Sequence, residues 1–215
     1  IRDSGSLKAS VILKDLAPFV PALSRFEEPL DLNLVFSGHG KHLDCPTLRL
    51  TNHHGLMIAG EAALSNWDAG MDMYIYGKLG NLTMTKEGIN VLMTNLTGKV
   101  PPILQRLDYI RFNGEAAGYL HDLTLTGLFH TGAGMVKTDV MMSIDEQSMS
   151  RTYSGSVASA DLDLGKLLNQ EKKFGKVDFN VELKGFNYKN RYPESYIKGI
   201  ISSFEYSQYQ YENIT

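Results

Sequence analysis

The sequence has one cysteine, one tryptophan, no surplus of basic residues and no long apolar run. With Cys45 alone, the chain forms no internal disulfide bond. The 21 lysines and arginines are outnumbered by 24 aspartates and glutamates, so the cationic surface that nucleic-acid binding needs is missing. No apolar stretch approaches the roughly 18 residues that cross a bilayer, and no signal segment opens the chain. These absences argue against a nucleic-acid partner and a disulfide-stapled domain.

Sequence motifs of catalysis are also missing, because no GxSxG, P-loop or GxGxxG pattern occurs. Two carboxylate pairs have the residue types of acid–base catalysis, namely Glu27 with Glu28 and Asp161 with Asp163. The first pair lies in a polar link, and the second lies at the start of a short helical turn. Solvation and helix capping explain them better than catalysis does. We therefore expect no enzyme and no catalytic residue.

One cluster has the residue types of a metal site: His39, His42, Asp44 and Cys45, with His53 and His54 nearby. A zinc site needs about four converging ligands, and the spacings of known zinc motifs are absent here. Glycines predict a turn at this cluster, so surface histidines are the simpler interpretation. Cys45 has no evident base to activate it, which favours a half-buried structural thiol. We expect neither a metal nor a cofactor.

Alternation of apolar and polar residues is the dominant pattern in the sequence. It runs through residues 7–13, 30–36, 71–75, 89–93, 136–144 and 177–183. Successive side chains of a strand point to opposite faces, so each run predicts a strand with one apolar face. Such strands are typical of an antiparallel sheet with one side in water. The predicted fold class is all-β.

Glycines near the ends of these runs predict turns or bulges that reverse the chain. They are Gly38, Gly60, Gly77, Gly98, Gly114, Gly127, Gly155 and Gly185. Helical periodicity is confined to three short segments, at residues 17–26, 100–107 and 164–169. We expect short helical turns there that cover an edge or an end of the sheet.

Internal repetition is a further feature of the sequence. Residues 13–38 and 162–185 share Asp-Leu, a helical turn, a polar link, an alternating strand and a glycine, and residues 96–118 are a weaker copy. We expect one elongated domain over residues 1–215, with approximate units at 7–95, 96–160 and 161–215. Because such units cannot bury an apolar face alone, they are expected to stack end to end. The chain begins at Ile1 and ends within a strand-like run, so we expect a fragment of a longer protein.

Two stretches near the C-terminus resemble a known family. They are YSGSVASADLDLGKLLNQEKKFGKVDFNVELKG, residues 153–185, and YIKGIISSFEYSQYQYENIT, residues 196–215. LKDLAPFV and GLMIAGEAAL in the first third fit the same family less closely. Together they are similar to the TamB branch of the AsmA-like superfamily, in the form found in Bacteroides-type bacteria. The motifs are degenerate, and the resemblance rests on their combination.

The resemblance implies an elongated antiparallel sheet curled into a half-pipe (a β-taco) whose apolar face lines a groove. It implies a periplasmic body, anchored in the inner membrane by a helix outside this chain. The implied role is phospholipid transport to the outer membrane, within outer-membrane biogenesis. The alternative role is a scaffold or chaperone for the assembly and secretion of outer-membrane β-barrel proteins. An Omp85-type barrel is an implied partner, through regions outside this chain.

A groove for phospholipid acyl chains needs a continuous apolar strip rather than a few catalytic groups, because each buried methylene contributes roughly 0.8 kcal/mol. The candidate groove-lining residues are Leu30, Leu32, Leu34, Phe36, Val177, Phe179, Val181 and Leu183. From alternation alone, the same residues would form the interior of a closed sandwich or barrel. A lipocalin-like barrel is therefore a third alternative, although the helical turns count against it.

Overall fold

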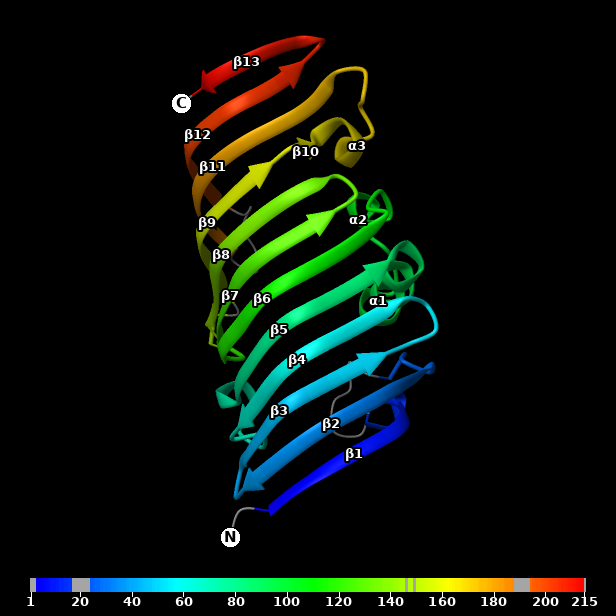
Figure 1. The fold of residues 1–215 in the computed structure, drawn as a ribbon. Helices are drawn as coiled ribbons and strands as arrows, with labels where there is room; N and C mark the ends of the chain where they lie inside the picture. Colours follow the sequence, from blue (N-terminus) through cyan, green and yellow to red (C-terminus); the bar gives the residue numbers. More distant parts are fainter. Residues whose placement is uncertain (1–2, 17–23, 146, 149, 188–193, 215) are drawn as a thin grey trace.

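The computed structural model places the chain in one open, antiparallel sheet (Figure 1). It describes residues 3–16, 24–145, 147–148, 150–187 and 194–214. The strands are β1 (Asp3–Ile12), β2 (Pro29–His39), β3 (His42–Thr51), β4 (Leu56–Ser65), β5 (Tyr74–Thr85), β6 (Tyr109–Tyr119), β7 (Asp122–Thr131), β8 (Gly134–Asp145), β9 (Ser150–Ala160), β10 (Leu162–Asp163), β11 (Phe174–Asn187), β12 (Glu194–Tyr206) and β13 (Tyr209–Ile214). The helical elements are η1 (Leu13–Leu16), η3 (Gly70–Asp72), α1 (Lys86–Thr97), α2 (Pro102–Gln105) and α3 (Leu164–Leu168).

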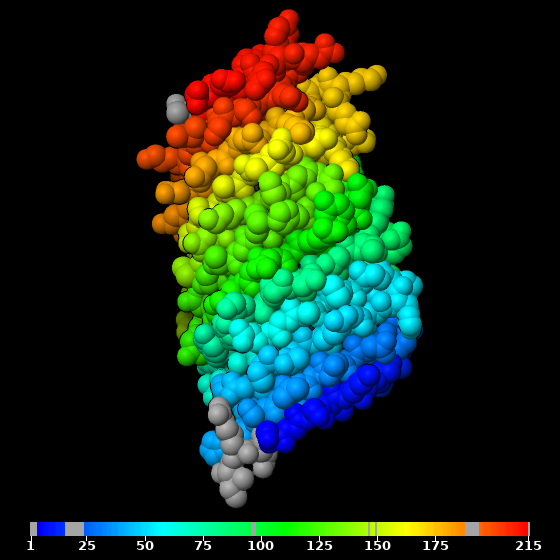
Figure 2. Space-filling view, viewed as in Figure 1, coloured from blue at the N-terminus to red at the C-terminus, as the bar shows by residue number. Residues whose placement is uncertain are grey.

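The strand order follows the sequence from β1 to β13, except that β9 pairs directly with β11 and the short β10 pairs with β11. β1 and β13 stand at opposite ends of this path, so the described strands form an open sheet rather than a barrel. Figure 2 shows the strands as successive bands along an elongated body, with the blue and red ends far apart. The expected all-β class with short helical turns is confirmed.

The sheet has two chemically different faces, because paired residues of neighbouring strands point to the same side. The apolar face is defined by one cross-strand row, which consists of Leu7, Leu34, Leu48, Gly60, Leu79, Gly114, Gly127, Thr138, Val157, Val181 and Gly199. The outer face is defined by a row on the opposite side, consisting of Glu61, Lys78, Glu115, Thr126, Asp139, Ser156, Glu182 and Lys198.

The helices pack against one end of the apolar face, along the edge where Figure 1 shows α1, α2 and α3. Ile89 of α1 and Leu167 of α3 join Ile110 and Val177 of the sheet in one buried cluster. Arg106, directly after α2, donates a hydrogen bond to the carbonyl of Leu167 and so links the helical segments. The helices therefore shield one edge of the curved sheet, on the inside of its curve.

Local sequence signals set the ends of these helices. Thr85 precedes α1, and its hydroxyl accepts a hydrogen bond from the amide of Gly88 at 3.2 Å. Gly98 ends α1 in the left-handed conformation, with φ of 78°. Asp163 precedes α3, and its carboxylate accepts from the amide of Lys166 at 2.8 Å. Capping by Asp163 is thus confirmed.

The prediction of a strand at residues 89–93 is wrong, because these residues lie within α1. Ile89 and Met93 are four residues apart, so on a helix they share a face and both pack into the core. Met71 is likewise not in a strand but in η3, and β5 begins only at Tyr74. The alternating runs at 7–13, 30–36, 136–144 and 177–183 coincide with β1, β2, β8 and β11, apart from Leu13, which opens η1.

Two of the three helical predictions are confirmed in short form. Residues 100–107 contain α2, and residues 164–169 contain α3. Within the third segment, 17–26, residues 17–23 lie outside the described residues, and residues 24–25 form a turn. Among the described residues, none of the helices combines the length and the hydropathy required to span a membrane.

Most of the glycines predicted at strand ends instead lie inside strands. Gly60, Gly114 and Gly155 are each flanked by paired residues, and Gly60 and Gly114 lie at register shifts in the pairing with β5. A Cβ on Gly60 would lie 2.1 Å from the carbonyl oxygen of Lys78 on the next strand. Glycine is needed at such points because the backbone of the neighbouring strand approaches too closely for a side chain. These positions bend the strands rather than reverse them.

Candidate binding surface on the apolar face

The eight candidate groove residues lie on two strands near opposite ends of the sheet and share the apolar face. Leu30, Leu32, Leu34 and Phe36 belong to β2, and Val177, Phe179, Val181 and Leu183 belong to β11. Leu34 and Val181 are members of the same cross-strand row, which connects them through β3 to β9. The structure therefore places the two groups on one surface without direct contact between them.

Burial divides these eight residues. Leu30 is 5% exposed and Val177 is 6% exposed, so the chain itself covers both side chains. Phe179 is half-buried and packs against the helix-covered core. The other five, Leu32, Leu34, Phe36, Val181 and Leu183, are also half-buried. Exposure of the apolar face is greatest farther from the helices, where Ile197 is 71% exposed.

Aromatic rings cover several glycines on the apolar face. The Phe112 ring lies against Gly114 and Gly127, and a Cβ on Gly127 would come within 2.4 Å of it. Phe36 covers Gly5 in the same way, and Tyr153 covers Gly185. Packing an aromatic ring over a cross-strand glycine fills the space that the missing side chain leaves. The apolar surface is therefore continuous across the bends of the strands.

Several polar groups on the apolar face are hydrogen-bonded. The Ser159 hydroxyl donates to the carbonyl of Val177 at 3.0 Å and accepts from the amide of Phe179 at 3.1 Å. The Tyr153 and Ser195 hydroxyls lie 2.5 Å apart, across Gly185 and far from the helices. An apolar ligand over these positions would consequently leave the hydroxyls of Ser159, Tyr153 and Ser195 with their partners.

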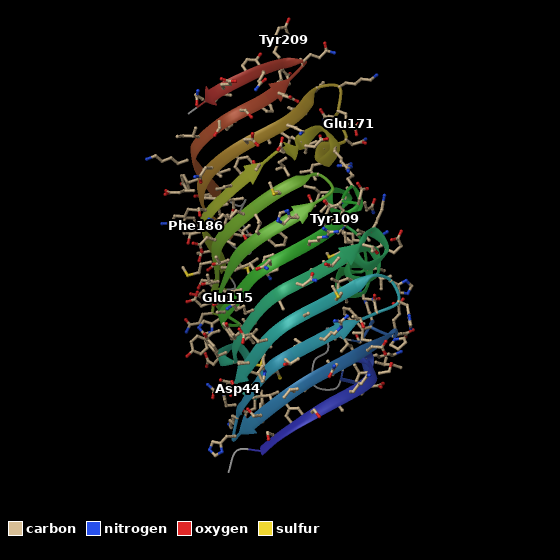
Figure 3. The ribbon with its side chains drawn as sticks, in the orientation of Figure 1. Asp44, Tyr109, Glu115, Glu171, Phe186 and Tyr209 are labelled. Atoms are coloured by element: carbon tan, nitrogen blue, oxygen red, sulfur yellow. The ribbon has the colours of Figure 1, made fainter. Side chains whose placement is uncertain are left out.

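Charged residues are concentrated on the outer face, where Figure 3 labels Tyr109 toward the helix-bearing edge and Glu115 and Phe186 toward the other. Lys78 and Glu61 form an ion pair there at 3.9 Å. Exposed pairs of this kind contribute little to stability. The charged side chains keep this face in water.

Of the histidine cluster, His39 and His42 flank the β2–β3 turn as expected, Asp44 and Cys45 lie within β3, and His53 and His54 lie in the turn before β4. The chain reverses at Gly40, whose φ is 58°. His42 contacts the Ser65 hydroxyl at 2.6 Å and the Asp44 carboxylate at 3.0 Å. Among the residues that the structure describes, no cluster of three or more His, Cys, Asp and Glu side chains is arranged to hold a metal ion.

Cys45 is half-buried in β3 on the apolar face, next to Ala62 of β4. Burial raises the pKa of the Cys45 thiol, and the negative charge of Asp44 raises it further. A raised pKa lowers the thiolate fraction at neutral pH, so this environment does not activate a nucleophile. The prediction of a half-buried thiol is confirmed.

Sequence reasoning missed two features of this surface. The first is α1, whose Ile89 is 1% exposed and anchors the cover over the apolar face. The four-residue spacing between Ile89 and Met93 is the sequence signal that could have indicated this helix. The second is the accessible end of the face at Ile197. No local pattern marks this residue, because its exposure depends on whether a helix lies above it, and none of the described helices does.

No family model, curated protein or solved structure matches this chain in the comparisons with known proteins.

Proposed function

We propose that this chain is a segment of a hydrophobic-groove protein that carries phospholipid acyl chains to the outer membrane. The observation that carries the proposal is the apolar row that crosses the sheet from Leu7 to Gly199 without a charged residue. An acyl chain needs apolar contact along its whole length and no hydrogen bonds. Each methylene removed from water would contribute roughly 0.8 kcal/mol.

The open sheet supports a groove over a closed sandwich. A sandwich would need a second sheet on the apolar face, and the described strands form one layer. Helices cover only one end of that face, while Leu7, Met142 and Ile197 remain exposed on it. Exposed apolar side chains on a connected surface are typical of a site that receives an apolar partner.

The wider setting belongs to the same proposal and rests on the resemblance to the TamB branch. There the curled sheet is a half-pipe of repeated units, at about residues 7–95, 96–160 and 161–215, within a periplasmic body anchored in the inner membrane. The order of elements is compatible with repetition, because η1, α2 and α3 precede the strand groups β2–β5, β6–β9 and β11–β13. An Omp85-type barrel would be contacted by other parts of such a protein.

A photo-crosslinking experiment in cells tests the proposal. A photoreactive amino acid is installed at Leu34 or Leu183 on the apolar face, and at Asn33 on the outer face of the same strand as Leu34. Mass spectrometry then identifies the adducts. Phospholipid at Leu34 and Leu183 but not at Asn33 is the expected result. Adducts formed only with the protein's own chain at both apolar positions would refute the groove.

A scaffold for β-barrel assembly is the second candidate, and the edge strand favours it. Within the described residues, β13 pairs with β12 on one side and has no strand on the other. Client strands could add to such an edge through main-chain hydrogen bonds. Crosslinks from the β13 edge at Gln210 to outer-membrane proteins, with none to lipid at Leu34, would favour the scaffold over the conduit.

A further inference from the structure

A depression on the outer face is not used by either proposed function. It extends over β7 to β12 and has a volume of about 1000 Å³. Its lining residues include Asp139, Met141, Ser154, Ser156, Glu182 and Tyr196. Because it lies on the polar side of the sheet, a ligand held there would not compete with one on the apolar face.

The shape of the depression follows from the side chains on three neighbouring strands. β9 contributes only small outward side chains at its centre, Ser154 and Ser156. β8 and β11 flank β9 and contribute longer side chains, among them Met141 and Glu182. Two strand spacings, roughly 9.5 Å, separate these walls. Tyr196 of β12, 62% exposed, extends the far wall.

The depression holds charges of both signs. Asp139 and Glu182 lie on either side of Ser156 in one cross-strand row, and Lys198 follows Glu182. Glu182 and Lys198 are cross-strand partners, yet the structure gives neither an ion pair with a described residue. Asp139 accepts one hydrogen bond from Thr126 at 3.0 Å. Lys184 also lines the depression, so two carboxylates and two ammonium groups are presented to a ligand without an excess of either charge.

This chemistry excludes several ligand classes. An acyl chain would desolvate the carboxylates, which is costly. A nucleic acid or other phosphate polymer would need a net positive surface. A peptide strand cannot pair face-on, because the backbone groups of these strands are used in the sheet. A neutral polyol, by contrast, both donates to carboxylates and accepts from ammonium groups and hydroxyls.

We propose that this outer-face depression binds a neutral oligosaccharide. Sugar hydroxyls donate to Asp139 and Glu182, and sugar oxygens accept from Lys198 and from the hydroxyls of Ser154 and Ser156. The exposed ring of Tyr196 packs against the apolar C–H side of a sugar ring. The small side chain of Ser156 also leaves the space in which the sugar ring lies.

Titration of the 215-residue chain with cellohexaose, maltohexaose and chitohexaose, followed by NMR and calorimetry, tests the proposal. Saturable binding of at least one of these neutral sugars is expected, with shifts confined to residues around β9. Ser156→Phe fills the trough, and Tyr196→Ala removes the ring. Each is expected to weaken binding by about tenfold or more. Asn33→Ala, on the outer face of β2, is the matched control and leaves affinity unchanged.

Other outcomes overturn the proposal. Absence of saturable binding by all three sugars does so directly. Binding that survives both Ser156→Phe and Tyr196→Ala places the sugar elsewhere. Saturable binding of an unstructured peptide or of polyphosphate at the same residues, in preference to the sugars, assigns the depression to another ligand class. Circular dichroism of each variant verifies that the sheet is intact.

Discussion

The apolar face has two ends along the direction of the strands, one beneath the helices and one away from them. The same strands run through both ends, and their side chains are similar, but their surroundings differ. At the helix-bearing end, Ile89, Val177 and Ile110 are at most 8% exposed and form a closed core. At the other end, Met142 is 42% exposed and Ile197 is 71% exposed. The difference comes from α1, α2 and α3 rather than from the sheet. One face therefore stabilises the fold at one end and remains accessible at the other.

The largest expected effect comes from placing a carboxylate at each end of the apolar face, which tests whether the two ends differ in burial. Val177→Asp buries a charge beneath α3, and we expect it to cost at least about 3 kcal/mol of the free energy of unfolding. Ile197→Asp keeps its charge in water and should change that free energy by less than about 0.5 kcal/mol. Urea denaturation followed by circular dichroism measures both. Equal losses would mean that the two ends are equally closed.

Truncation of the helical cover should have a similar but smaller effect. Ile89→Ala removes the most buried side chain of α1, and a loss of about 2–5 kcal/mol is expected, since the resulting cavity has no other group to fill it. Ile103→Ala on α2 is the matched control, because Ile103 is exposed. A stable Ile89→Ala variant would show that α1 is dispensable for the core.

A third pair of variants compares two glycines of the strands, one where the neighbouring backbone is close and one where there is open space. Gly155 has φ of 142°, and a Cβ there would lie 2.1 Å from the carbonyl oxygen of Asp139. Gly155→Ala should therefore cost about 1–3 kcal/mol. Gly77→Ala meets nothing within 4 Å and should change stability by less than about 1 kcal/mol. Thermal unfolding of both variants decides whether the bend requires glycine.

The cap of α3 is expected to contribute less. Asp163→Ala removes the carboxylate that accepts from the Lys166 amide, and a loss of about 1 kcal/mol is expected. Asp122→Ala, at the start of β7 and exposed, serves as its control. Denaturant midpoints measure the difference. If the two variants were equally stable, α3 would be held by packing alone.

The smallest predicted effect is a pH dependence at the helix-bearing end. The hydrogen bond and charge of Lys166 hold the pKa of Asp108 below its usual value. A lowered folded-state pKa contributes stability above the unfolded pKa, and this stability is lost as pH falls through the folded pKa. Lys166→Met should therefore flatten the acid limb of the denaturation midpoint between pH 5 and pH 2. Lys8→Met should leave that limb unchanged.

Alternation in the sequence predicted β1, β2, β8 and β11 because each has one face in water and one against apolar groups. The same rule failed at residues 89–93, since Ile89 and Met93 fit a helical face as well as a strand. The use of glycine as a signal for strand ends misassigned Gly60 and Gly155, because a glycine that bends a strand and one that ends it look alike in sequence. Tertiary contact, not local pattern, separates these cases.

The candidate surface was predictable from the sequence only in part, because alternation gives the face of a side chain but not its burial. All eight candidate residues share one face, as a period of two requires. Which of them are covered depends on the helices, so the burial of Leu30 and Val177 could not be read from β2 and β11 alone. The outer-face depression depends on Ser154 and Ser156 lying between longer side chains of other strands. Only the register shows that arrangement.

The sequential order of the strands has a consequence for folding. Nearly every strand pairs with its predecessor in the chain, so each strand finds its partner in the neighbouring segment of the sequence. Sequential pairing of this kind lets each strand join the sheet next to the strand that precedes it, with no search among distant strands. Insertion or deletion of a hairpin therefore leaves the order and pairing of the other strands unchanged. A protein of this design can change its length in evolution while each new strand needs only the preceding one as a template.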